Sequence, residues 1–262
     1  DILISTINGD LTVDADSVVE AKGDNATIAL RSSTGGMMLD ESYNIIYTDG
    51  SIYVDGAVRA SGENGAVEIY SANDAFGTGD VGISGEVTGD TVLIGAGLEF
   101  PYNALVDTLY PASKYGTGDI TFYAGANINA GSRVMVGTAS GDVAMSYGAT
   151  IDASAQNAKL DILTGFDSFG TGDIEINGDI SAANNGEIGI ASALGRGSTG
   201  NVSINDGATV NAGGDMMITA GFDATIFNDP VMLEYFGLSG YGGHIVLNGG
   251  VKAGGDMYVA AT

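Results

Sequence analysis

Four aspartates could act chemically as a group, because each follows a glycine and precedes a segment of alternating apolar residues. They are Asp80, Asp119, Asp142 and Asp173. If these segments are stacked strands, the carboxylates lie about 5 Å apart and repel one another unless something offsets the charge. One interpretation is Ca²⁺ or another hard cation held between the carboxylate oxygens. The other is that each carboxylate accepts backbone N–H groups in its own turn, as in Asx turns.

The wider sequence gives the metal interpretation little support. The familiar calcium-binding nonapeptide of the type Gly-Gly-x-Gly-x-Asp does not occur, and the chain has no cysteine. Thiolate metal sites and cysteine nucleophiles are therefore excluded. We predict no cofactor, with Ca²⁺ as the alternative.

The segments that carry these aspartates belong to a repeat, and the repeat predicts the fold. Each copy begins Gly-Asp, followed by an apolar, a variable and a second apolar residue; residues 172–182 are a clear example. A turn follows, then a branched residue and a small residue two positions later, six or eight residues after the first pair. A second turn leads to a third apolar pair. Alternation with period two indicates strands, and a repeat of this size is typical of a β-solenoid.

Eight copies supply the apolar pairs that we expect to point inward. In the first strand the pairs are Leu11/Val13, Ile52/Val54, Val81/Ile83, Ile120/Phe122, Val143/Met145, Ile174/Ile176, Val202/Ile204 and Ile245/Leu247. In the second strand they are Val19/Ala21, Val58/Ala60, Val87/Gly89, Ile128/Ala130, Ile151/Ala153, Ile180/Ala182, Val210/Ala212 and Val251/Ala253. In the third strand they are Ile28/Leu30, Val67/Ile69, Val92/Ile94, Val134/Val136, Leu160/Ile162, Ile188/Ile190, Met216/Ile218 and Met257/Val259. The predicted fold is all-β: a single-stranded parallel β-helix with three short strands per coil, about eight coils and three parallel sheets around a narrow core.

The domain prediction is one β-solenoid over residues 1–262, without a cap at either end. Residues 1–4 resemble a third strand, and so do the last residues of the chain. Solenoids need capping repeats, so we expect either a segment of a longer solenoid or subunits that stack end to end. The coils differ in length through insertions at one corner, at about 31–50, 95–117 and 220–243. Short helices are expected at 229–237, from its capping residues, and at 103–110.

The insertions are rich in aromatic residues, which are our candidates for binding or assembly. These candidates are Phe100, Tyr102, Tyr110, Tyr115, Phe222, Phe227, Tyr235, Phe236 and Tyr241. In one interpretation the insertions fold back over a sheet and cover outward residues such as Tyr53 or Val246. In the other they form an aromatic flank for a neighbouring subunit or a glycan, because aromatic residues are enriched in interface cores.

The charge of the chain excludes some partners. The formal net charge is −25, from 33 acidic and 8 basic residues. Nucleic acids and anionic membrane surfaces are therefore poor partners, whereas cations, basic proteins and neutral glycans stay compatible. No apolar stretch approaches the length of a membrane span, so membrane insertion is not expected.

The coil sequence resembles a known family. Residues 210–218, Val-Asn-Ala-Gly-Gly-Asp-Met-Met-Ile, and the similar run at 250–261 resemble repeats of filamentous haemagglutinin-like exoproteins, which are large bacterial adhesins. The resemblance covers the coil positions along essentially the whole chain. It implies a right-handed parallel β-helix, a secreted or cell-surface location, and adhesive or structural work. The family has no catalytic motif to carry over, so we expect no enzymatic activity.

Three functions remain open from the sequence. The first is an extracellular structural or adhesive element, either a fibre subunit that contacts copies of itself or a rod segment beside neighbouring repeats of a longer chain. The second is a module that binds glycans or proteins of a host or matrix. The third is a β-helix polysaccharide lyase or hydrolase that uses stacked carboxylates such as Asp142 and Asp173. Basic residues that a lyase needs for acidic polymers are scarce.

Overall fold

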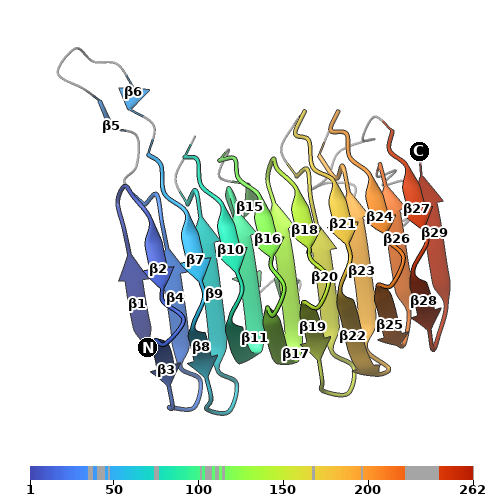
Figure 1. Cartoon of the computed structure of the whole chain (residues 1–262), viewed down its shortest axis with the longest axis horizontal. Helices are drawn as coiled ribbons and strands as arrows, with labels where there is room; N and C mark the ends of the chain where they lie inside the picture. Colours follow the sequence, from blue (N-terminus) through green and yellow to red (C-terminus); the bar gives the residue numbers. More distant parts are fainter. Residues whose placement is uncertain are drawn as a thin grey trace.

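The chain is built from parallel strands stacked along one axis (Figure 1). This computed structural model describes residues 1–34, 38–39, 45–46, 48–73, 77–100, 102–103, 108–109, 112–113, 116–166, 169–195, 197–221 and 242–261. All regular structure in these residues is β. The described part of the chain contains no helix long and apolar enough to cross a membrane.

The first strands of the repeats form one parallel eight-stranded sheet. Its strands, in spatial order, are β2 Leu11–Val13, β7 Ile52–Val54, β10 Val81–Ile83, β16 Ile120–Phe122, β18 Val143–Met145, β21 Ile174–Ile176, β24 Val202–Ile204 and β27 Ile245–Leu247. Each predicted apolar pair is in register with the next; Ile174, for example, pairs with Val202. The predicted stacking of first strands is therefore confirmed. We number the layers of the molecule from one, at β2, to eight, at β27.

The second and third strands join into a single sheet of fifteen strands. Its members are β1 Ile2–Ser5, β3 Val18–Ala21, β4 Thr27–Arg31, β8 Ala57–Ala60, β9 Ala66–Ser71, β11 Glu86–Ala96, β17 Asn127–Thr138, β19 Thr150–Ala153, β20 Lys159–Leu163, β22 Asp179–Asn184, β23 Glu187–Ser192, β25 Thr209–Gly213, β26 Met216–Ala220, β28 Gly250–Ala253 and β29 Met257–Ala261. The expectation of three separate sheets was wrong, because β11 and β17 run through the corner between the second and third strand positions. The register shifts at that corner, between Gly89 and Thr91. The strand β1 pairs with β4, so residues 2–5 occupy a third-strand position, as predicted.

The core lies between the two sheets and collects the inward residues of all three strand positions. In the inner layers these side chains are almost fully buried; Ile52, Ile128 and Ile94 are each 0% exposed. Burial of branched apolar side chains is the main favourable contribution to folding, at about 1.5–3 kcal/mol for each. The inward apolar face, which recurs in every strand position, therefore accounts for the stacking of these elements.

Short antiparallel hairpins occur in the insertions. The strands β12 Leu98–Glu99 and β15 Ala112–Ser113 pair, as do β13 Tyr102–Asn103 with β14 Thr108–Leu109 and β5 Met38–Leu39 with β6 Ile45–Ile46. The helix expected at 103–110 was wrong, because the backbone at its two ends is extended and paired. The helix expected at 229–237 lies outside the described residues.

Glycines in front of the aspartate row allow the layers to approach closely. A Cβ atom placed on Gly50, Gly79, Gly118, Gly141, Gly172, Gly200 or Gly243 would lie 2.0–2.4 Å from the carbonyl oxygen of the glycine one layer before. Real Cβ atoms do not come this close to backbone oxygens. The Gly of the Gly-Asp repeat is therefore required by the spacing between layers and not only by a turn.

Replacement of one row glycine by alanine should destabilise the stack. In Gly172→Ala the new methyl group would clash with Gly141 O at 2.3 Å and with Thr164 Cβ at 2.8 Å. We expect a loss of about 1–3 kcal/mol in the free energy of unfolding, measured by urea denaturation. Gly23→Ala is the matched control, because its Cβ would meet only Ala26 at 3.9 Å. Equal losses in the two variants would contradict this steric requirement.

Candidate functional site

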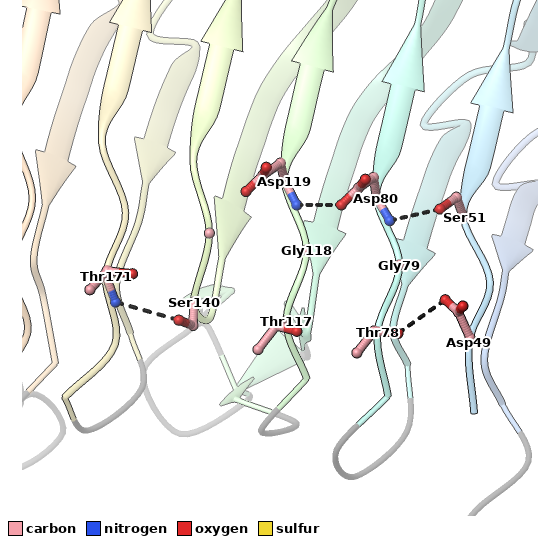
Figure 2. Close-up of a pocket in the computed structure, with 11 residues that line it drawn as sticks. Asp49, Ser51, Thr78, Gly79, Asp80, Thr117, Gly118, Asp119, Ser140 and Thr171 are labelled. Atoms are coloured by element: carbon pink, nitrogen blue, oxygen red, sulfur yellow. Dashed lines mark hydrogen bonds between the residues drawn. The ribbon is translucent and has the colours of Figure 1, made fainter. Parts of the chain in front are cut away.

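The aspartate row links successive layers through its side chains. The Oδ1 atom of Asp80 accepts the backbone N–H of Asp119 at 2.9 Å. Asp119, Asp142 and Asp173 repeat this contact with the next member of the row at 2.7–2.8 Å. Figure 2 shows the bonds from Asp119 to Asp80 and from Asp80 to Ser51. The sequence-based alternative of N–H acceptance was right in its chemistry and wrong in its partner, which belongs to the next layer.

Neutral side chains continue the same row at both of its ends. The hydroxyl oxygen of Ser51 accepts the N–H of Asp80 at 3.0 Å, and Asn201 Oδ1 accepts the N–H of His244 at 2.9 Å. At the first layer Asp10 accepts the N–H of Ser51 at 2.8 Å. What the members share is therefore a side-chain acceptor and not a negative charge. Each of these solvent-exposed hydrogen bonds contributes about 0.5–1.5 kcal/mol to stability.

Electrostatics act against ionisation in the middle of the row. The pKa of Asp142 is raised above its ordinary value, mainly because burial disfavours the charged form. The N–H of Asp173 lowers it, and the neighbouring carboxylates of Asp119 and Asp173 raise it. Because the folded pKa is the higher one, this group stabilises the fold at low pH, and that contribution is lost as the pH rises.

A second polar row lies two residues upstream of the first. Its members are Thr78, Thr117, Ser140, Thr171 and Thr199, and both rows line shallow grooves that open to solvent. Thr78 Oγ1 donates to Asp49 Oδ1 at 3.0 Å, and Ser140 Oγ accepts the N–H of Thr171 at 3.4 Å (Figure 2). Hydroxyls and carboxylates thus alternate across a regular polar strip.

A third row, which the sequence analysis missed, connects the strip to the core. The buried hydroxyls of Ser32, Ser71, Thr138, Thr164 and Ser192 each donate to the carbonyl of a row glycine, at 2.5–2.9 Å. The sequence contains a pattern that indicates this row. Each of these residues follows the last inward apolar residue of its third strand by two positions. These bonds hold the end of a third strand against the start of the next first strand.

All four candidate metal ligands of the aspartate row lie in the described part of the chain. Among the described residues, no three acidic or histidine side chains converge in a way that could hold a metal ion. Asp80, Asp119, Asp142 and Asp173 each have one oxygen bonded to a backbone N–H. The Ca²⁺ alternative stays a prediction that calorimetry tests.

One aromatic candidate is buried by its own chain. Phe100 is 2% exposed and belongs to a second apolar cluster on the outer face of the third strands, with Tyr70, Leu93 and Met135. Its ring lies 3.2 Å from the position of a Cβ on Gly137. At Phe100 the insertion therefore covers the outer face of the third strands, and the cover suggested for Tyr53 or Val246 stays a prediction.

The other aromatic candidates have no described side-chain position. Tyr102 lies in β13. Tyr110, Tyr115, Phe222, Phe227, Tyr235, Phe236 and Tyr241 lie outside the described residues. Their role in binding or assembly stays a prediction.

Substitution of Asp142 should separate its acceptor role from its charge. Asp142→Asn keeps an oxygen for the N–H of Asp173 and removes the charge, so the free energy of unfolding should rise at pH 7. The gain should vanish well below the ordinary aspartate pKa of about 3.9, where wild-type Asp142 is protonated. Asp142→Leu removes both the charge and the acceptor, so it should be about 0.5–1.5 kcal/mol less stable than Asp142→Asn at both pH values. Urea denaturation near pH 3 and near pH 7 measures both effects.

Two results would contradict this account of the row. One is an asparagine variant that is as unstable as the leucine variant. The other is heat of Ca²⁺ binding to the wild type that disappears in Asp142→Asn, which would establish the metal alternative.

Comparison with known proteins adds no relative. No protein-family model, no curated protein and no solved structure matches this chain. The resemblance to filamentous haemagglutinin-like exoproteins therefore still depends on the repeat residues alone.

Proposed function

We propose that this chain is an extracellular structural or adhesive rod: a closed, right-handed, single-stranded β-helix of about eight coils. It serves as a fibre subunit or as a rod segment of a surface filament or adhesin. The parallel sheets and the core between them support this proposal, because such a structure lengthens along one axis by repeating the same contacts. The resemblance of its repeats to surface adhesins supports the location.

The exposed apolar residues of the outer layers carry the proposal. Met257 and Val259 in β29 are 45% and 42% exposed, whereas Met216 and Ile218, their register partners in β26, are 2% and 0% exposed. Ile4 in β1, at the opposite end of the stack, is 38% exposed. Another parallel layer would bury these side chains and would extend the sheet beyond β29.

In both the fibre and the longer chain, a further layer would lie on the edge formed by β29. A separate subunit would supply a layer of a second copy, and a longer chain would supply its own next repeat. Contacts through the aromatic insertions would then add lateral association between rods. The strong negative charge opposes unspecific side-by-side aggregation and so favours growth along the axis.

A charge placed on the exposed edge should block end-to-end assembly. We expect the wild-type chain to form ordered fibres at high concentration, and Val259→Lys to remain as single rods, because a lysine there would be buried unpaired by the next layer. Negative-stain electron microscopy and analytical ultracentrifugation over a concentration series measure the outcome.

Val246→Lys is the matched control for this experiment. Val246 is also 42% exposed in the last layer, but it is the outward residue of β27. This variant should assemble like the wild type. Strictly monomeric wild-type rods would contradict the fibre form, and equal loss of assembly in both variants would contradict stacking through the apolar edge.

A further inference from the structure

Turns of unequal length open a groove at the corner between first and second strands. Four residues form this turn in layers one and four, at 14–17 and 123–126. Two residues form it in layers two and three, at 55–56 and 84–85. Because β3, β8, β11 and β17 pair in that order, the short turns lie between the long ones. The long turns are the walls of the groove, and the short turns lie at its floor.

A surface of two tyrosines adjoins this groove on the eight-stranded sheet. A Cβ atom on Gly82 would lie 2.9 Å from the ring of Tyr53 and 3.1 Å from the ring of Tyr123. The two rings therefore flank the Gly82 position from layers two and four, on the same face of the sheet. Tyr123 is 47% exposed. Position 82 carries no side chain that could separate the two rings.

The two tyrosines are close in sequence to turns that form the groove. Tyr53 precedes the floor turn 55–56 by two residues, and Tyr123 is the first residue of the wall turn 123–126. The rings stand on a strand and at a strand end, so the sheet holds them in place. Such a surface needs little ordering when a ligand binds, which favours affinity.

Fixed polar groups lie inside the groove. The guanidinium of Arg59 donates two bonds to Glu86, Nε to Oε1 at 2.8 Å and Nη2 to Oε2 at 2.6 Å. Thr88 adds a bond to Glu86 Oε1 at 2.9 Å. The hydrogen bonds from Arg59 lower the pKa of Glu86, which keeps this carboxylate charged. Asp16 and Asp55 also line the groove, so acceptors outnumber cationic donors.

We propose that the Tyr53–Tyr123 surface and the adjoining groove bind a neutral polysaccharide chain. Tyrosine faces offer apolar area for the flat faces of sugar rings, with a hydroxyl at the edge for hydrogen bonds. The carboxylates and Arg59 offer partners for sugar hydroxyls. The surplus of negative charge opposes an acidic polymer. A protein partner would need an apolar interface core, and Val18 is the one large aliphatic residue among those that line the groove.

This site does not depend on assembly of the rod. Its two tyrosines lie in layers two and four, inside the stack, and only the wall turn 14–17 belongs to the first layer, at the end opposite β29. Binding of polysaccharide and formation of fibres can therefore fail or succeed separately, which keeps the two proposals distinguishable.

The test uses the full chain with insoluble cellulose, chitin and mannan in pull-down assays. Calorimetry with soluble neutral oligosaccharides follows for any polymer that retains the protein. We expect retention by at least one neutral polymer, and Tyr123→Ala should weaken binding at least about tenfold, because half of the aromatic surface is lost. Unchanged thermal unfolding of the variant shows that the fold is intact.

Tyr147→Ala is the matched control. Tyr147 is 74% exposed and lies in another turn, with its ring 3.3 Å from the position of a Cβ on Gly207. This variant should bind like the wild type. The proposal is overturned if no neutral polysaccharide retains the protein, if both alanine variants lose binding equally, or if the acidic polymers alginate and heparin bind as tightly as the neutral ones.

Discussion

The close approach of glycine backbones in neighbouring layers is the constraint on which the rest of the structure depends. A methyl group at these positions would lie within 2.4 Å of a carbonyl oxygen of the adjacent layer. Glycine at these positions lets the layers lie close enough for the residue that follows it to form hydrogen bonds with the next layer through its backbone and its side chain. The hydrogen bonds of the aspartate row, the buried hydroxyls and the register of the first strands all depend on this spacing.

The polar rows explain how an acidic chain tolerates stacked carboxylates. Each carboxylate of the row satisfies an N–H group that would otherwise be unpaired between layers, and serine and asparagine do the same where they replace aspartate. Burial, with smaller contributions from the carboxylates of Asp119 and Asp173, raises the pKa of Asp142, so its ionised form costs stability at neutral pH. The row is thus a structural device in which the acceptor oxygen pairs the N–H of the next layer and the charge is incidental.

The proposed functions use different parts of this stack of layers. End-to-end assembly uses the apolar edge at β29, where the inward residues have no layer above them. Polysaccharide binding uses a corner where short turns leave a groove between long ones. Both proposed functions follow from a repeat in which the core residues stay constant and the connecting segments vary, as in other repeat proteins.

The sequence by itself determined the strand positions of the repeats, their inward residues and their register, because period-two alternation at a constant phase allows one stacking; it did not predict the hairpins of the insertions or the joining of second and third strands into one sheet. Ile174 pairs with Val202 as the pattern predicted. The tertiary structure decided the contacts between layers, which join residues 23 to 43 positions apart in the aspartate row. The acceptor role of Asp80 toward Asp119 and the meeting of Tyr53 and Tyr123 over Gly82 are of this kind. Such contacts depend on how one layer lies on the next, and no local pattern of residues encodes that distance.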